Sequence, residues 1–146
     1  MNECSRRRFL VLAPAAAVAL PAVLSGCGGS SGTPVDGTVT VQNGKAALSF
    51  AQFPQLQSVG GAVVVSANTG ADYLVIRTGA MDATALSAVC THAHCLVGYQ
   101  ASGAKIVCPC HGSEYAVNGA VTHGPSIAAL ATFPATLDAA GITIAV

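Results

Sequence analysis

Short runs of apolar and β-branched residues, separated by Gly, Asn and Asp, fill the chain from Thr38 onward. These runs predict strands, because no stretch after residue 30 shows a long apolar period of 3.6 residues with capping residues. The predicted strands are Thr38–Val41, Ala46–Phe50, Ala62–Ser66, Tyr73–Thr78, Thr84–Val89, Lys105–Val107, Tyr115–Val117 and Ile142–Val146, with an Asn43-Gly44 turn after the first and one helical turn within Phe53–Val59. Many short strands at this spacing are typical of an all-β sandwich or barrel.

Composition narrows the class of protein. A length of 146 residues allows one compact domain. With 52% hydrophobic and 8% charged residues, most of the chain is too apolar to be disordered. The formal net charge is zero, so the chain lacks the clustered cations of a phosphate-binding groove, and we expect no nucleic-acid partner.

The first 26 residues differ from the rest. Three arginines (Arg6 to Arg8) precede an apolar run over residues 9–24, and small residues then lead to Cys27, which is the order of a secretory signal. The run is broken by Pro14 and Pro21, and a helix that spans a bilayer needs about 20 apolar residues. An uncleaved membrane anchor is therefore the alternative.

Two motifs refine this prediction. Residues 5–10 (SRRRFL) resemble a twin-arginine export motif, with an ordinary basic segment as the alternative, and residues 24–27 (LSGC) resemble a lipobox, whose cysteine is acylated. We expect an export signal over 1–26, a flexible tether over 27–37 and a folded domain over 38–146. The protein would then be exported, periplasmic or on the outer side of the bacterial membrane, and lipid-anchored at Cys27.

Cysteine and histidine gather in two segments of the folded part. Residues 90–95 read CTHAHC, and residues 108–115 read CPCHGSEY. A zinc site could use a Cys₂His₂ set made of Cys90, His92, Cys108 and His111, but Cys-x-His spacing is less usual for zinc and two cysteines are left over. A pure disulfide framework of four cysteines allows three connectivities and leaves the histidines unused.

The two segments together resemble the Rieske [2Fe–2S] family in its disulfide-containing, high-potential branch. The CTHxxC motif is followed, after twelve residues, by CPCHGSxY, and residues 119–125 (GAVTHGP) are similar to the family's proline loop. The resemblance covers residues 38–146. It implies an all-β, Rieske-like antiparallel sandwich or barrel with an inserted cluster-binding subdomain of two loops, over residues 88–118.

The family pattern also implies the ligands of one [2Fe–2S] cluster. Cys90 and Cys108 would bind one iron as thiolates, and His92 and His111 would bind the other through ring nitrogens. Because neutral imidazoles replace two anionic sulfurs, Rieske clusters accept an electron at about −150 to +300 mV, against about −400 mV for plant-type ferredoxins. Cys95 and Cys110 match the disulfide that links the loops, which requires an oxidising compartment and so agrees with export.

Further residues match positions around the family's cluster. The hydroxyls of Ser113 and Tyr115 would hydrogen-bond cluster sulfur and stabilise the reduced state. Gly112 would let the backbone pass close to the cluster, and Gly124 with Pro125 would close a third loop over it.

The first loop departs from the CTHLGC of cytochrome bc-type members. Ala93 replaces the Leu that lies at the quinol-docking surface, and His94 replaces a Gly whose backbone angle His adopts less readily. His94 does not fit the ligand spacing, and we expect it to face solvent.

The resemblance implies a one-electron carrier between redox partner proteins, without substrate chemistry of its own. The alternatives are the iron–sulfur subunit of a quinol–cytochrome c reductase, with cytochrome b or c as partner, and the small subunit of a molybdenum oxidase of the arsenite oxidase type. An oxygenase ferredoxin is disfavoured by the export signal and the extra cysteine pair. A structural zinc module is the non-redox alternative.

Overall fold

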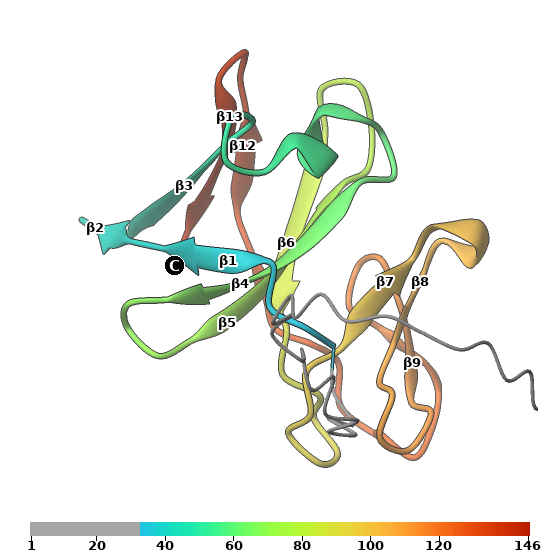
Figure 1. Ribbon diagram of the computed structural model, residues 1–146. Helices are drawn as coiled ribbons and strands as arrows, with labels where there is room; N and C mark the ends of the chain where they lie inside the picture. Colours follow the sequence, from blue (N-terminus) through green and yellow to red (C-terminus); the bar gives the residue numbers. More distant parts are fainter. Residues whose placement is uncertain (1–32) are drawn as a thin grey trace, which may run out of the picture.

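Residues 33–146 form an all-β unit in the computed structural model, which describes this part of the chain (Figure 1). The strands are β1 (Gly37–Val39), β2 (Val41–Gln42), β3 (Lys45–Ser49), β4 (Ala62–Ala67), β5 (Asp72–Arg77), β6 (Ala83–Ser87), β7 (Gly98–Gln100), β8 (Lys105–Val107), β9 (Glu114–Ala116), β10 (Val121–His123), β11 (Thr132–Phe133), β12 (Ala135–Leu137) and β13 (Gly141–Ala145). Two short 3₁₀ helices, η1 (Pro54–Gln57) and η2 (Ala101–Gly103), are the helical elements of this region. The predicted all-β class and the predicted turn after Phe53 are confirmed.

The strands form three sheets. A five-stranded sheet has the order β1-β4-β5-β6-β11, and two four-stranded sheets have the orders β12-β13-β3-β2 and β10-β9-β8-β7. All pairings are antiparallel except that of β1 with β4, which is parallel. The predicted antiparallel architecture is confirmed, and the one parallel pair lies at the edge of the five-stranded sheet, where β1 runs beside β4.

The five-stranded sheet is buried on both faces. Val63 and Val65 of β4 pack into one apolar cluster, whereas Val64 between them packs into another. The next strand repeats this alternation, with Val75 on the first side and Leu74 on the second. Successive side chains of a strand point to opposite faces, so a sheet covered on both sides needs apolar residues without interruption. The unbroken apolar runs of β4 and β5 follow from this position.

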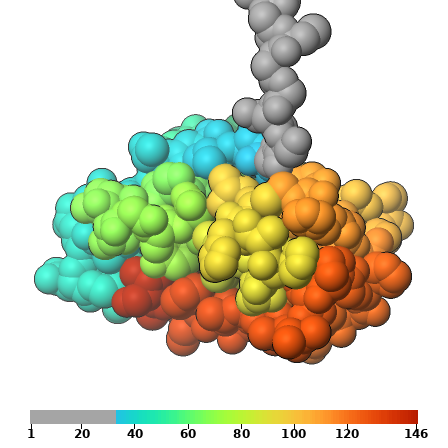
Figure 2. All heavy atoms as spheres, turned by 90° about the horizontal axis from the view of Figure 1, so that it is seen from below, coloured from blue at the N-terminus to red at the C-terminus, as the bar shows by residue number. Residues whose placement is uncertain are grey.

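The two clusters separate the molecule into a base and a tip. The first cluster lies between the five-stranded sheet and the β12-β13-β3-β2 sheet. The second faces the small sheet of β7 to β10 and contains Cys90, Cys108 and Tyr115. Figure 2 shows the segment around residue 90 between the five-stranded part of the molecule and the segments that follow residue 105. The cysteines predicted to bind metal therefore lie in an apolar core of their own, separate from the core of the base.

The predicted strand Thr38–Val41 is divided in the structure. Thr40 lies outside the strands; β1 before it pairs with β4, and β2 after it pairs with β3. Asn68 fixes this crossover, because its backbone N–H donates to the carbonyl of Val39 (3.1 Å) and its Oδ1 accepts from the N–H of Val41 (2.8 Å). Alternation along a strand does not reveal which sheet it joins, so the switch was not predicted.

Local sequence explains why the turn between β2 and β3 was predicted and why four other strands were not. The Asn43-Gly44 turn is confirmed: both residues have positive φ (51° and 72°), as the tight turn between β2 and β3 requires. Strands β7, β10, β11 and β12 were not predicted. They are two or three residues long and mostly partly exposed, so they carry no clear apolar alternation.

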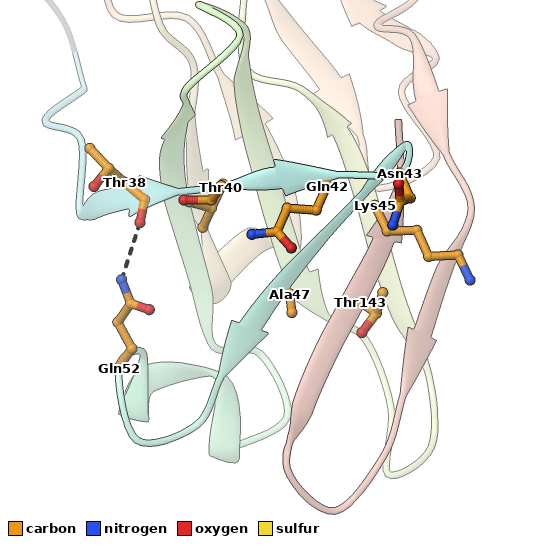
Figure 3. A pocket seen from close by; sticks show the side chains of 9 residues that line it. Thr38, Thr40, Gln42, Asn43, Lys45, Ala47, Gln52 and Thr143 are labelled. Carbon is orange, nitrogen blue, oxygen red and sulfur yellow. Dashed lines mark hydrogen bonds between the residues drawn. The ribbon is translucent and has the colours of Figure 1, made fainter.

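A hollow of about 780 Å³ lies at the base, away from the cysteines. It is lined mainly by hydroxyl and amide side chains, among them Thr38 of β1, Gln42 of β2 and Gln52 of the turn after β3 (Figure 3). The amide of Gln52 donates to the carbonyl of Thr38 across it (3.1 Å). Between residues 33 and 146 no helix has the length and apolar character to cross a membrane.

Gly141 provides a test of the packing of the base. It starts β13 opposite Ser49, and a Cβ at this position would lie 2.1 Å from the carbonyl oxygen of Leu48. We predict that Gly141→Ala lowers the free energy of unfolding by about 1–3 kcal/mol or more, because the paired backbones must separate. Urea denaturation measures this value.

Gly103→Ala is the matched control. Its Cβ would meet only the flexible side chain of Lys105, at 3.5 Å or more, so a change within about 0.5 kcal/mol is expected. Equal losses in the two variants would contradict this account of the β3–β13 contact.

Candidate metal centre

The two cysteine-containing segments form loops of the same backbone geometry. In the first loop the N–H of Cys90 donates to the carbonyl of Cys95 (2.9 Å), and the N–H of His94 donates to that of Cys90 (3.0 Å). In the second loop Cys108 pairs in the same way with Ser113 (2.8 Å) and Gly112 (3.0 Å). Antiparallel pairs close both loops, Val89 with Leu96 and Val107 with Glu114. Each motif thus forms the end of a hairpin.

Matching positions of the two loops have left-handed backbone. The fifth residue is His94 in the first loop (φ 58°) and Gly112 in the second (φ 75°). Glycine adopts this conformation without cost, whereas a side chain at Cβ strains it. The expectation that His94 occupies a position suited to glycine is confirmed, and its side chain is exposed as expected.

A disulfide joins the loops. Cys95 and Cys110 are bonded, with their Cα atoms 6.5 Å apart and a sequence separation of 15. This confirms the pairing that the family resemblance implied. Both residues are partly buried, and their bond holds the two loops against each other. In Figure 1 the loops lie together at the lower end of the view, beyond β7 to β9.

The four predicted ligands lie in two pairs, one of cysteines and one of histidines. Cys90 and Cys108 are free thiols with 0% and 1% of their surface exposed, and they hydrogen-bond each other. His92 and His111 are exposed, with ring centroids 4.9 Å apart and planes at 88°. The structure therefore brings all four residues to one region, with sulfur inside and imidazole at the surface.

The thiol pair is electrostatically asymmetric. Burial raises the pKa of Cys90, but hydrogen bonds from Tyr115, Ser126 and the backbone of His92 outweigh it and lower the pKa to about 6. At Cys108 burial raises the pKa, and the hydrogen bond with Cys90 raises it further. The surroundings of Cys90 thus favour a negatively charged sulfur, the form in which cysteine binds metal.

Hydroxyl groups surround these sulfurs. Ser113 and Tyr115 are both fully buried. The Tyr115 hydroxyl lies 3.3 Å from the sulfur of Cys90, and the Ser113 hydroxyl accepts a hydrogen bond from the N–H of Ser126 (3.0 Å). The structure thus places the Tyr115 hydroxyl at a cysteine sulfur, whereas the contact of the Ser113 hydroxyl is with the backbone of residue 126.

A third loop covers the pair, and it starts at Gly124 and Pro125, which are joined by a cis peptide bond. Ser126 follows, 4% exposed, with its hydroxyl 2.6 Å from that of Tyr115 and 3.5 Å from the sulfur of Cys90. The hydroxyl of Thr91 ties this loop to the first by donating to the carbonyl of Ala128 (2.7 Å). The sequence analysis missed Thr91 and Ser126; the hydroxyl directly after Gly124-Pro125 was the available signal for Ser126.

The spacing of the donor atoms distinguishes the candidate metals. A zinc ion bound at 2.0–2.3 Å places tetrahedral ligands about 3.3–3.8 Å apart. Among residues 33–146 the only three donors that lie within 4.8 Å of one another are those of Cys95, Cys108 and Cys110, and two of these form the disulfide. No such group includes His92 or His111. The separated sulfur and imidazole pairs fit a binuclear iron–sulfur cluster and do not fit a single zinc ion.

Comparison with known proteins agrees with this geometry. Residues 50–134 match the family model of the Rieske [2Fe–2S] domain. The cytochrome b6-f complex iron-sulfur subunit of Synechococcus sp. (strain JA-3-3Ab) is 47% identical over 66 residues, which are 45% of this chain and 38% of that subunit. The chloroplastic subunit 1 of Nicotiana tabacum is 42% identical over 67 residues, 45% of this chain and 29% of the relative. The chain thus matches less than two-fifths of the length of these relatives.

Solved structures resemble the fold. The plasma membrane Rieske protein PetC3 from Synechocystis PCC 6803 superposes with a TM-score of 0.55 at 30% identity, covering 62% of this chain and 91% of that one. The ferredoxin of carbazole 1,9a-dioxygenase from Nocardioides aromaticivorans IC177 has a TM-score of 0.54 at 23% identity, over 68% and 93% of the two chains, and this likeness concerns the fold alone. Since the family model matches more than half of the sequence, and the loops carry the donors of one [2Fe–2S] cluster, the chain belongs to the Rieske [2Fe–2S] domain family.

Proposed function

We propose that this protein transfers single electrons through a [2Fe–2S] cluster held by Cys90 and Cys108 on one iron and by His92 and His111 on the other. The observation that carries the proposal is the sorting of these donors into a buried sulfur pair and an exposed imidazole pair. When bound, such a cluster supplies one reversible oxidation–reduction step. Because the histidines are exposed, the path of an electron from the cluster to a partner protein is short. The cysteine sulfurs are buried and therefore shielded from water.

The surrounding residues support a cluster that is easily reduced. Tyr115 places its hydroxyl at the sulfur of Cys90, and the family motif assigns a similar role to Ser113; donors to sulfur stabilise the added negative charge of the reduced state. Gly112, with φ 75°, lets the second loop turn between His111 and Ser113. Gly124 and Pro125 start the third loop, which packs over Cys90 through Ser126.

A second candidate is the iron–sulfur subunit of a cytochrome complex, with cytochrome b or c as its partner. It is favoured by the identity shared with cytochrome b6-f subunits. Ala93 opposes it, because the cytochrome bc-type members have a leucine at this docking position. Haem absorption after affinity purification from detergent-solubilised membranes supports the complex, and molybdenum instead of haem supports an oxidase of the arsenite oxidase type.

Residues 1–32 lie outside the described part, and their role is proposed from sequence. We propose that residues 1–26 direct export, that Cys27 carries a lipid and that a tether over residues 27–37 leads to the domain of residues 38–146. The end of this tether is held to the domain, because Asp36 hydrogen-bonds Val64 and Gly37 begins β1. The Cys95–Cys110 disulfide supports export, since such bonds persist in oxidising compartments. The domain would then work on the outer side of the membrane.

The ligand assignment predicts a selective loss of iron. We expect Cys108→Ser and His111→Ala to lose the cluster, because each removes one of the four donors. The readouts are iron and acid-labile sulfide content, with low-temperature EPR of the dithionite-reduced protein. Parent protein should contain about two irons per chain.

His94→Ala is the matched control for the histidine variant. His94 lies in the same exposed region but outside the proposed ligand set, so this variant should retain iron and its EPR signal. Iron retained in His111→Ala but lost from His94→Ala would reverse the assignment. Colourless parent protein that contains zinc and no iron would overturn the proposed function.

The lipid anchor predicts a change in fractionation. Cys27→Ala should move the exported protein from the membrane fraction to the soluble periplasmic fraction, because the acylated side chain is missing. Cys4→Ala, which changes the other cysteine of the N-terminal segment, should leave the protein in the membrane. If Cys27→Ala remains membrane-bound, an uncleaved helical anchor is the better account.

A further inference from the structure

Ser126 lies at the point where the hydroxyl groups of the site meet, outside both cysteine motifs. Its backbone N–H donates to the Ser113 hydroxyl (3.0 Å), and its own hydroxyl lies 2.6 Å from that of Tyr115. It is also 3.5 Å from the sulfur of Cys90, within hydrogen-bonding range of sulfur. One buried residue of the third loop thus touches both hydroxyls that the family motif provides and one of the sulfurs.

The hydrogens of this network can be assigned by counting. Thr91 donates its hydroxyl hydrogen to the carbonyl of Ala128, which can only accept (2.7 Å). The hydroxyl hydrogens of Tyr115 and Ser126 remain for the 2.6 Å contact between their oxygens, the 3.1 Å contact of Tyr115 with the Thr91 oxygen, and the contacts of both hydroxyls with the sulfur of Cys90. A thiolate is the strongest acceptor present, so one hydrogen points toward the sulfur and the other lies between the oxygens.

The distances indicate the order in which the hydroxyl groups donate hydrogen bonds. Tyr115 is nearer to the sulfur, at 3.3 Å, than Ser126, at 3.5 Å. Tyr115 therefore donates to Cys90, and Ser126 donates to Tyr115. Donation to the tyrosine oxygen polarises its O–H bond and strengthens the donation to sulfur, as in other chains of buried hydrogen bonds.

We propose that Ser126 is a positioning residue that raises the reduction potential of the cluster by acting through Tyr115. The inference rests on the proposed function, since it requires Cys90 as a ligand. The reduced state gains most from a stronger donor, because its added negative charge is spread partly onto the cysteine sulfur. Removal of the Ser126 hydroxyl should therefore favour the oxidised state.

The test is a redox titration of Ser126→Ala, monitored by EPR or visible circular dichroism. The backbone N–H that holds Ser113 survives this substitution, so only the hydroxyl chain is shortened. We expect the equilibrium constant for reduction to fall roughly two- to fivefold, which for a one-electron couple is a downward shift of about 20 to 40 mV. Iron content and the EPR line shape should match those of the parent.

Ser87→Ala is the matched control. The Ser87 hydroxyl accepts from the N–H of Val89 (3.2 Å), close to Cys90 in sequence, and we expect no shift in potential when it is removed. Ser126→Gly, measured alongside, removes the same hydroxyl and should shift the potential in the same direction as Ser126→Ala.

The possible outcomes are distinct. A potential unchanged in Ser126→Ala, or shifted no more than in Ser87→Ala, overturns the proposal. Loss of iron from both Ser126 variants, with iron retained in Ser87→Ala, also overturns it, because Ser126 would then serve only to hold the loop. Parent protein without a Rieske EPR signal instead refutes the proposed function, so the two failures are distinguishable.

Discussion

The two loops that carry the predicted ligands must stay at a fixed separation, because the metal centre needs donors from both. Each loop alone presents one buried sulfur and one exposed imidazole, and only their apposition yields a sulfur pair and an imidazole pair. The Cys95–Cys110 bond fixes the apposition covalently. The contact of Tyr115, from the strand after the second loop, with Cys90 of the first adds a buried polar link at the same place.

The sheets explain why such an apposition is stable. The five-stranded sheet is apolar on both faces, so one face packs the base and the other packs the tip, where Cys90 and Cys108 belong to the core itself. Burial of a thiolate costs free energy unless donors compensate it. The hydroxyls at Cys90 supply this compensation, and they lower its pKa to about 6 despite burial.

The sequence predicted features that depend on local chemistry. The all-β class, the Asn43-Gly44 turn and the unusual backbone at His94 follow from short runs and motifs whose residue types restrict their geometry, and the disulfide followed from the family resemblance that two of these motifs carry. The crossover at Thr40 was not predictable, because the choice between two sheets depends on Asn68, distant in sequence. Ser126 was missed for the same reason: its contacts are with residues 11 and 36 positions away, and its place directly after Gly124-Pro125 was the one local signal.

The two exposed imidazole rings lie 4.9 Å apart and so share one patch of the surface. A carrier of the proposed kind would therefore accept and donate its electron at this same surface patch. Donor and acceptor cannot be seated there together and must take turns. The rate of electron transfer through the protein would then be limited by the dissociation of the first partner, which favours weak, short-lived complexes over tight ones.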